Sequence, residues 1–287
     1  ISSGIDNVQI IGLLFALIFI LISLSFKFGA APFHMWIPDV YHGSIITTTL
    51  LLSTIPKIAV FVIVIKLLGI VFSGLFLFWS DMVLILAVLS ILVGNIIAIS
   101  QTNVKRMLAY STIANIGFIL LGLSVGSIIA YKAAMFYTLT YVITTVAVFG
   151  LLSQLVYKKK PVENISDLSG LNSSKPFLAF LLMVILLSYI GIPPLLGFHA
   201  KLFIIQSLVE SNNIPLSIFA VLMTVIGSFY YLRVIKVIYF DELKDELLTT
   251  SKLYFTGIYV IGLMLLGLFP DILGQLSQYS ISNLFNT

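Results

Sequence analysis

Cysteine is absent from this chain of 287 residues. Its absence excludes disulfide bonds, thiolate metal sites, iron–sulfur ligation and cysteine catalysis. The sequence also lacks a phosphate-binding loop and a dinucleotide fingerprint, and it has only three histidines and 11 acidic residues. We therefore expect no metal site and no bound cofactor in this chain.

Charge is scarce as well. Charged residues make up 9% of the sequence and hydrophobic residues 60%, against about 25% and about 45–50% in ordinary globular proteins. A mean hydropathy of +1.16 excludes a soluble enzyme, a nucleic-acid reader and a disordered chain. The pI near 9.1 reflects only 15 basic against 11 acidic residues, which we attribute to loop asymmetry. The composition indicates a polytopic, all-α membrane protein.

Hydrophobic runs of about 20 residues are long enough to cross a bilayer as helices. Breaks at charged, proline and glycine residues divide the sequence into eight expected spans, at about 8–33, 45–72, 77–100, 104–125, 129–157, 176–208, 214–240 and 253–270. The more polar tail after Pro270 is expected at the membrane interface. We expect no separate signal peptide before the first span.

Basic residues gather on one side of this topology. Ten fall in or beside loops of one side, here side A: Lys105, Arg106, Lys158, Lys159, Lys160, Lys175, Arg233, Lys236, Lys244 and Lys252. Side B has only Lys132. The positive-inside rule therefore predicts that side A faces the cytoplasm or matrix, with both termini on side B.

Three lysines fall inside expected spans, namely Lys27, Lys57 and Lys201. A charge at the bilayer centre costs about 2.5–3.5 kcal/mol on insertion scales, so each is a candidate functional residue. A lysine that only snorkels toward an interface is the alternative. Burial disfavours the charged form, so a buried lysine can exchange protons where an arginine cannot. We therefore expect these three lysines to take part in proton translocation.

Four further residues are weaker candidates for a proton relay. His34 and His199 lie near helix ends, as does His42, and Lys66 follows Lys57 by nine residues. A histidine titrates near neutral pH, but a lone histidine at a helix end is more often structural. Lys66 could instead snorkel toward side B.

Two spans are interrupted by residues that disrupt helices. The predicted breaks are at Pro32 and Pro38, at the end of the first span and shortly after it, and at Gly191, Pro193 and Pro194 in the sixth. Broken backbone at membrane depth is tolerated where it lines a cavity or is buried in protein, and paired broken helices are typical of inverted-repeat transporters. We assign residues 1–72 to the end of a first repeat, 73–240 to a complete five-helix repeat and 241–287 to a last helix and tail.

No carboxylate falls inside the expected spans. Asp39, Asp81, Glu163, Asp167, Glu210, Asp271 and the acids of 241–246 are all expected in loops or at helix ends. A lysine relay without a counter-charge is incomplete, so we expect the partner acid on another polypeptide.

Five motifs resemble the NADH dehydrogenase subunit 2 family of respiratory complex I, in that family's order. They are KFGAAPFHMWIPDVY at 27–41, STIPKIAVF at 53–61, NVKRMLAYSTIANIG at 103–117, GIPPLLGFHAK at 191–201 and GSFYYLRVIK at 227–236. The resemblance covers nearly the whole chain. It implies an antiporter-like fold in which Lys27, Lys57 and Lys201 translocate protons.

The sequence departs from the family's pattern at its start and at two histidines. The family's first six helices have no counterpart here, and with them is missing a glutamate that pairs with the Lys27 position. A split gene, with those helices on a separate chain, is our expectation. His42 replaces a commoner Glu or Gln, and His199 stands where small residues are usual.

The resemblance implies a core membrane-arm subunit of proton-pumping NADH:ubiquinone oxidoreductase. NADH, FMN, iron–sulfur clusters and ubiquinone would be bound by other subunits, and membrane-arm subunits and lipids are the expected partners. A split, truncated subunit fits a rearranged organellar genome. We therefore expect this chain in the mitochondrial inner membrane, with its termini toward the intermembrane space. The alternatives are a subunit of a cation/proton antiporter or membrane hydrogenase, and a scaffold that does not pump.

Overall fold

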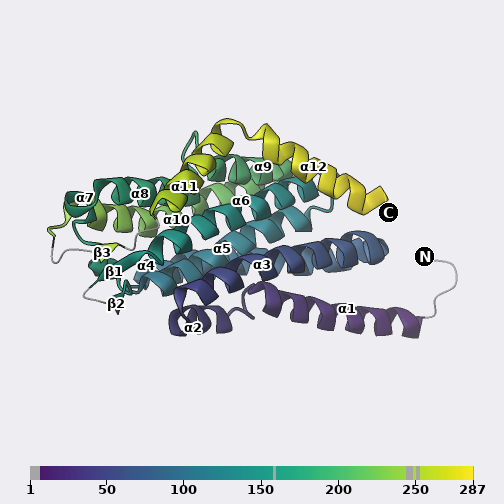
Figure 1. The fold of residues 1–287 in the computed structure, drawn as a ribbon. Helices are drawn as coiled ribbons and strands as arrows, with labels where there is room; N and C mark the ends of the chain where they lie inside the picture. Colours follow the sequence, from purple (N-terminus) through teal and green to yellow (C-terminus); the bar gives the residue numbers. More distant parts are fainter. Residues whose placement is uncertain (1–6, 158–159, 244–247, 250–252, 287) are drawn as a thin grey trace.

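The computed structural model describes residues 7–157, 160–243, 248–249 and 253–286, and is a bundle of helices that run along one long axis (Figure 1). The first half holds α1 (Asn7–Phe28), α2 (Trp36–Gly43), α3 (Ile46–Val64), a π-helical turn η1 (Ile65–Val71), η2 (Ser73–Leu75), α4 (Phe76–Ser100), α5 (Val104–Ser124) and α6 (Ile128–Leu152). The second half holds β1 (Leu155–Tyr157), β2 (Lys160–Pro161), η3 (Ile165–Leu168), α7 (Leu171–Ser174), α8 (Pro176–Ile190), α9 (Leu196–Glu210), α10 (Ile214–Phe240), β3 (Leu248–Thr249), α11 (Leu253–Leu268) and α12 (Asp271–Asn286).

The expected membrane spans correspond to helices. Among the described residues, six helical segments are long and apolar enough to cross a membrane, and α11 with α12 forms a further candidate bent by 80°. The remaining expected span, 176–208, is divided between α8 and α9, of 15 residues each. The prediction of a polytopic all-α chain with two discontinuous helices is confirmed.

The predicted end of the fifth span, near residue 157, is wrong. The helix α6 ends at Leu152, and Leu155–Tyr157 forms the central strand of a small antiparallel sheet with order β2-β1-β3. Val156 pairs with Pro161 on one side and with Leu248 on the other. An apolar run of this length fits a buried strand as well as a helix, so hydropathy alone does not separate the two.

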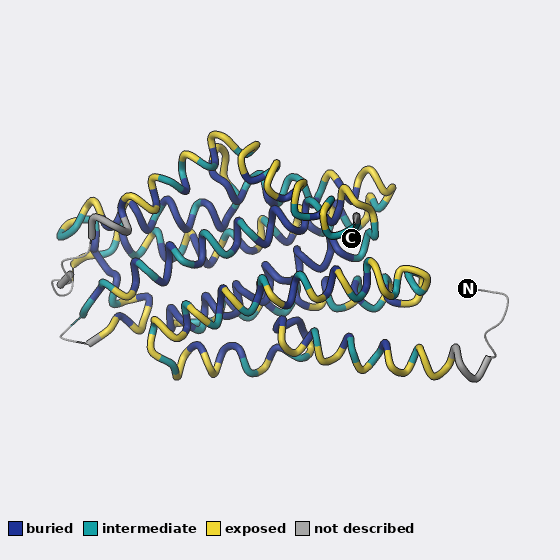
Figure 2. Tube along the Cα trace, turned by 45° about the vertical axis from the view of Figure 1, so that its right-hand side comes forward, coloured by how far each residue is buried: buried dark blue, intermediate teal, exposed yellow. Residues whose placement is uncertain are grey.

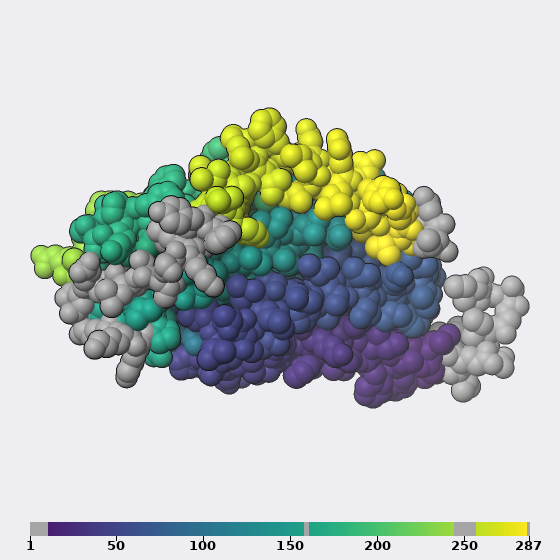
Figure 3. All heavy atoms as spheres, in the orientation of Figure 1, coloured from purple at the N-terminus to yellow at the C-terminus, as the bar shows by residue number. Residues whose placement is uncertain are grey.

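The tail after Pro270 is a helix that packs against the bundle. The helix α12 lies along α6, where the rings of Tyr131 and Phe285 stack at 5.5 Å between centroids. Figure 3 shows α11 and α12 covering one lateral side of the molecule. The predicted interfacial segment is therefore part of the bent α11–α12 unit.

The centre of the bundle is α5. From Val104 to Leu123 only Arg106 is not buried, whereas the outer faces of α1, α4 and α10 expose large apolar side chains such as Phe19, Leu77 and Val225 (Figure 2). Glycines let α4 and α5 approach closely, since a Cβ on Gly117 would lie 2.6 Å from Ile91 Cγ1. Small residues at helix contacts are typical of membrane bundles.

Basic side chains hold the side A end together. Lys105 Nζ donates to the carbonyl oxygens of His42 and Ser44 at 2.7 and 2.9 Å. The Arg233 guanidinium donates to Ile99 O at 2.7 Å and to Gln101 O. These residues therefore cap loops and helix ends as well as contributing charge. At the opposite end of the bundle α1 begins and α12 ends (Figure 1).

Candidate functional site

The first broken helix is interrupted between α1 and α2. After Phe28, Gly29 adopts a φ of 82°, and Gly29 N and Ala30 N both donate to Ser25 O. Residues 29–35, with Pro32 among them, carry the chain across the break to Trp36. The left-handed backbone at the first residue is one that only glycine adopts readily.

Pro38 does not break the helix, contrary to the sequence prediction. It lies in α2, which begins at Trp36. Proline is tolerated in the first turn because the N–H that it lacks has no partner within the helix there. A proline motif alone does not reveal which proline precedes a helix and which lies inside its first turn.

The second broken helix is interrupted between α8 and α9. Gly191 ends α8 with a φ of 90° and donates its N–H to Leu187 O at 3.0 Å. Pro193 and Pro194 follow, and α9 begins at Leu196. Close packing holds the two halves together, because a Cβ on Gly197 would overlap the carbonyl of Ser188.

Lys57 lies against the first break. Its side chain is fully buried, and Nζ donates to Phe28 O at 2.8 Å and to Lys27 O at 3.5 Å. The ammonium also lies 5.1 Å from the centroid of the Trp36 ring. The last carbonyls of a helix carry partial negative charge and lack partners within the helix, so Lys57 of α3 caps the carboxyl end of α1.

Lys201 makes the same kind of contact at the second break. Its Nζ donates to Tyr189 O at 3.0 Å and to Ile190 O at 2.9 Å, the last carbonyls of α8. The ring of Phe118 lies 5.5 Å from Nζ. The first half of each broken helix, α1 or α8, therefore ends at a lysine ammonium.

Lys27 and Lys66 do not join this arrangement. Lys27 is in the last turn of α1 with its side chain exposed, although its carbonyl oxygen faces Lys57. Lys66 is exposed on η1. The structure thus separates the lysines at the two breaks, Lys57 fully buried and Lys201 partly buried, from two lysines on the outer surface of this chain.

The three histidines lie apart from one another. His34 is buried within the first break, with its ring 6.3 Å from that of Tyr110. His199 is partly buried on α9, beside Phe203. Among the described residues, the Nδ1 atoms of both have no hydrogen-bond partner. His42 is exposed, and its carbonyl oxygen accepts from Lys105.

A network of hydroxyl and amide groups fills the bundle centre and was missed by the sequence analysis. We call it the hydroxyl–amide cluster: Ser111, Thr112 and Asn115 of α5, Tyr137, Tyr141 and Thr145 of α6, Tyr189 of α8 and Tyr231 of α10. Tyr137 Oη donates to Asn115 Oδ1 at 2.8 Å, and Tyr141 Oη donates to Thr112 Oγ1 at 3.0 Å. The spacing of these residues on α5 and α6, three or four apart, was the available signal.

The cluster continues to Lys201. Tyr189 Oη lies 2.8 Å from Thr145 Oγ1, and the Tyr189 carbonyl accepts from Lys201 Nζ. Asn115, Tyr137, Tyr189 and Lys201 also line a cavity of about 10 Å³, room for about one water molecule. A water in this cavity, together with the neighbouring hydroxyls, could pass a proton to or from the Lys201 amine.

Acidic groups that could hold a metal ion do not gather anywhere in the described part of the chain, where no group of three His, Cys, Asp or Glu residues has suitable geometry. The chemistry that these residues support is proton transfer between amines, hydroxyls and water.

Sequence comparisons identify relatives along most of the chain. A family model described as "NADH:quinone oxidoreductase/Mrp antiporter, TM" matches residues 3–227. NADH-quinone oxidoreductase subunit N of Thioalkalivibrio sulfidiphilus is 46% identical over 276 residues, which are 94% of this chain and 57% of the relative. Subunit N of Hydrogenovibrio crunogenus is 44% identical over 284 residues, 98% of this chain and 59% of the relative. The chain therefore spans less than two thirds of the length of these relatives.

Solved structures show the same fold. A chain of respiratory complex I from Thermus thermophilus with bound aureothin matches with a TM-score of 0.76 at 29% identity, over 96% of this chain and 60% of that chain. A chain of the Mrp complex from Dietzia matches with a TM-score of 0.84 at 19% identity, over 98% and 60% respectively. At the latter identity the likeness concerns the fold alone.

These comparisons confirm the predicted family resemblance but not every expectation. The expected mitochondrial location has no support, because the relatives are bacterial. The multi-pass membrane character is supported by both the family match and the apolar helices. Since the family model covers most of its sequence, the chain belongs to the transmembrane family described as NADH:quinone oxidoreductase/Mrp antiporter.

Proposed function

We propose that this chain is a proton-translocating membrane subunit of an NADH:quinone oxidoreductase. The observation that carries the proposal is the pair of lysines, Lys57 and Lys201, each held at the carboxyl end of a broken helix. Curated relatives at 46% and 44% identity are subunits of that enzyme, whereas the Mrp likeness rests on fold at 19% identity. The oxidoreductase is therefore favoured over a cation/proton antiporter.

The mechanism that we propose is a lateral relay along the membrane midplane. Lys57 and Lys201 hold and release protons, and the hydroxyl–amide cluster, with water entering the adjoining cavity, passes them toward Lys201. An ammonium at Lys57 or Lys201 binds the terminal carbonyls more strongly than a neutral amine does, because those carbonyls carry the negative end of the helix dipole. Protonation is thereby coupled to the geometry of each break.

Lys27 is the proposed link to a partner. Its side chain is exposed on α1, which supports an acidic group supplied from outside the described residues. We propose that this group, on a membrane-arm subunit or a preceding segment, pairs with Lys27. A change in the charge of this pair then acts electrostatically on Lys57 across the end of α1. His34, His199 and Lys66 are candidates for auxiliary roles in this relay.

The repeat organisation and the sidedness belong to the same proposal. The breaks at Gly29 and Gly191 are similar: proline follows each glycine, and a lysine caps the helix before each break. This similarity supports our assignment of residues 1–72 to the end of one repeat and of 73–240 to a second. The basic end that includes Lys105 and Arg233 faces the cytoplasm or the equivalent organellar compartment. NADH, FMN, iron–sulfur clusters and quinone are bound by other subunits of the complex.

The test is a comparison of proton and electron transfer in sealed vesicles that hold the assembled complex. Lys57→Met and Lys201→Met are expected to reduce protons translocated per NADH oxidised, while uncoupled NADH oxidation continues. Lys236→Met, at an exposed lysine of α10 with no part in the proposed relay, is the matched control. Unchanged stoichiometry in both Lys57→Met and Lys201→Met would support a scaffold role, and isolation of the chain without NADH-oxidising activity would favour an independent antiporter.

A further inference from the structure

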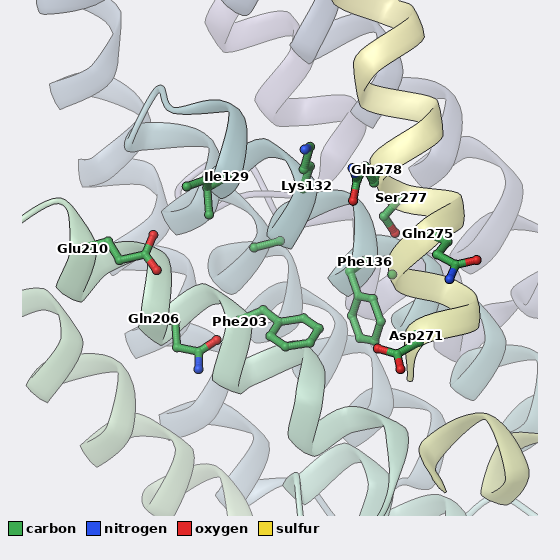
Figure 4. A pocket seen from close by; sticks show the side chains of 12 residues that line it. Ile129, Lys132, Phe136, Phe203, Gln206, Glu210, Asp271, Gln275, Ser277 and Gln278 are labelled. Carbon is green, nitrogen blue, oxygen red and sulfur yellow. The ribbon is translucent and has the colours of Figure 1, made fainter. Parts of the chain in front are cut away.

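A polar pocket opens on the outer surface of the bundle, between α6, α9 and α12. Its volume is about 320 Å³. In Figure 4, Gln206 and Glu210 of α9 lie across the pocket from Gln275 of α12, and Lys132 of α6 lies between the two walls. Lys132 is partly buried and the other three side chains are exposed, so all four are open to a ligand from outside the chain. We call this volume the lateral pocket.

The lateral pocket lies near the side B surface of the membrane, where α6 begins and α9 ends. A Cβ on Gly122 would lie 2.6 Å from Ile204 Cδ1 and 3.1 Å from Ala134 Cβ, so these parts of α9 and α6 are at the same depth. Lys132 precedes that alanine by two residues and is therefore nearly level with Ile204. Glu210 lies about 9 Å further toward side B, at 1.5 Å per residue. The lysine is thus deeper in the membrane than the glutamate.

The pocket carries charges of both signs that the helices hold apart. Among the described residues that line it, Lys132 is the cation, and Glu210 and Asp271 are the acids. Neither acid forms an ion pair with Lys132 in the described part of the chain. A zwitterionic ligand, whose own opposite charges are separated by covalent bonds, is complementary to such an arrangement. Two acids against one lysine disfavour a ligand of net negative charge.

Amide groups complete the polar lining and favour a ligand that both donates and accepts hydrogen bonds. Gln206, Gln275 and Gln278 each present an amide oxygen, which accepts, and an amide NH2, which donates. A phosphate can accept from the lysine ammonium and from amide N–H groups. A primary ammonium has three N–H donors for carboxylate and amide oxygens, whereas a trimethylammonium has none. The lining therefore favours a phosphate joined to a primary amine.

An open hollow on the outer face of α12 adjoins the lateral pocket. The two share Gln275 and Gln278, and the rest of the hollow is mainly Ile272, Leu276 and Tyr279. These three large side chains are exposed, and at i, i+4 and i+7 they share one face of the helix. A molecule with its polar group in the pocket can therefore lay a hydrocarbon chain along α12.

We propose that the lateral pocket binds the headgroup of a phospholipid of the phosphatidylethanolamine class, with an acyl chain on the exposed face of α12. The phosphate accepts from Lys132 and Gln206, and the ammonium donates to Glu210. In a lipid of the side B leaflet the ammonium lies further from the bilayer centre than the phosphate, which is the order in depth of the glutamate and the lysine.

The size of the pocket fits a headgroup and not a whole lipid. Its volume of about 320 Å³ is at the lower end of the range of about 300–1,000 Å³ for small-molecule sites, so the acyl chains remain on the outer surface. A lipid bound in this way bridges α6, α9 and α12 and holds the bent α11–α12 unit against the bundle. The site takes no part in the proposed proton relay, and the inference does not depend on the proposed function.

The first arm of the test is photolabelling of the assembled complex in phosphatidylcholine nanodiscs. The probe is a phosphatidylethanolamine with a diazirine in one acyl chain, and labelled peptides of this chain are identified by mass spectrometry. We expect label on residues 271–282. Unlabelled phosphatidylethanolamine is expected to lower that label at least threefold, whereas the same mole fraction of phosphatidylglycerol, or soluble phosphoethanolamine in the buffer, leaves it unchanged.

The second arm changes the charges of the pocket. Glu210→Gln and Lys132→Met are each expected to lower the label about threefold, the effect of one ion pair at an exposed site. Glu210→Lys is expected to reverse the preference, so that phosphatidylglycerol competes better than phosphatidylethanolamine. Asp81→Asn, at an exposed acid of α4 outside the pocket, is the matched control. Assembly of every variant is checked on a native gel.

Each outcome supports or overturns the inference. Absence of label on residues 271–282, equal competition by the two phospholipids, or full label in Glu210→Gln overturns it. Competition by soluble phosphoethanolamine assigns the pocket to a free zwitterion and overturns a lipid site. Because the gain of phosphatidylglycerol binding in Glu210→Lys requires a folded pocket, it supports the inference even where another variant fails to assemble.

Discussion

Replacement of Lys57 by methionine tests whether this residue is a proton carrier or only a helix cap. The change preserves side-chain length and removes the ammonium, so Phe28 O loses its donor at 2.8 Å. A buried carbonyl without a partner costs about 1–3 kcal/mol. Removal of a fully desolvated ammonium offsets this loss, since burial of an isolated charge itself costs several kcal/mol. We therefore expect a net change of about 2 kcal/mol or less in either direction, and an assembled complex.

Lys57→Arg separates charge from proton exchange. The guanidinium can still donate to Phe28 O, but it does not release a proton at physiological pH. We expect both variants to assemble on a native gel and both to lose proton translocation at least tenfold relative to uncoupled NADH oxidation, with Lys236→Arg, at an exposed lysine of α10, unaffected. An arginine variant that pumps with the original stoichiometry would refute the reasoning, because a fixed positive charge would then suffice.

Three further substitutions test the packing and the cluster. Tyr137→Phe removes the donor to an amide oxygen in the cluster, and we expect slower proton translocation with normal assembly, measured in vesicles. Gly117→Ala places a Cβ 2.6–2.8 Å from α4 and is expected to cost about 1–3 kcal/mol by overpacking, lowering the thermal midpoint of the complex, whereas Gly150→Ala meets nothing within 4 Å and should not. Lys105→Met, which loses two carbonyl contacts, is expected to destabilise by about 1.5–3 kcal/mol, while Asp39→Asn removes a solvent-exposed ion pair worth about 0–1 kcal/mol.

Much of the fold was accessible from the sequence, because it depends on local chemistry. Long apolar runs predicted the spans, Pro32 predicted the first break, and Gly191 with the two following prolines predicted the second. The family motifs pointed to Lys57 and Lys201. Boundaries were less accessible: Pro38 resembles a breaker but occupies a first helical turn, and Leu155–Tyr157 is apolar in either a helix or a strand.

The contacts of the site were not accessible, because they depend on which faces of distant helices meet. Asn115 and Tyr137 are 22 residues apart and bond only because α5 packs against α6. Lys27 and Lys57 looked equivalent in sequence, yet one side chain is exposed and the other fully buried. The 80° bend between α11 and α12 was not accessible either, because hydropathy carries no information on the angle between two helices.

The two lysine caps differ in the origin of the amine, and this difference determines what a change of charge can move. Lys57 belongs to α3 and donates to the last carbonyl of α1, so it joins two separate transmembrane segments. Lys201 belongs to α9 and donates to the last carbonyl of α8, the other half of its own segment. Loss of a proton would loosen a contact between neighbours at the first site and a hinge within one segment at the second. Proton loss would thus let α3 slide relative to α1 at the first site, and let α8 and α9 bend relative to each other at the second.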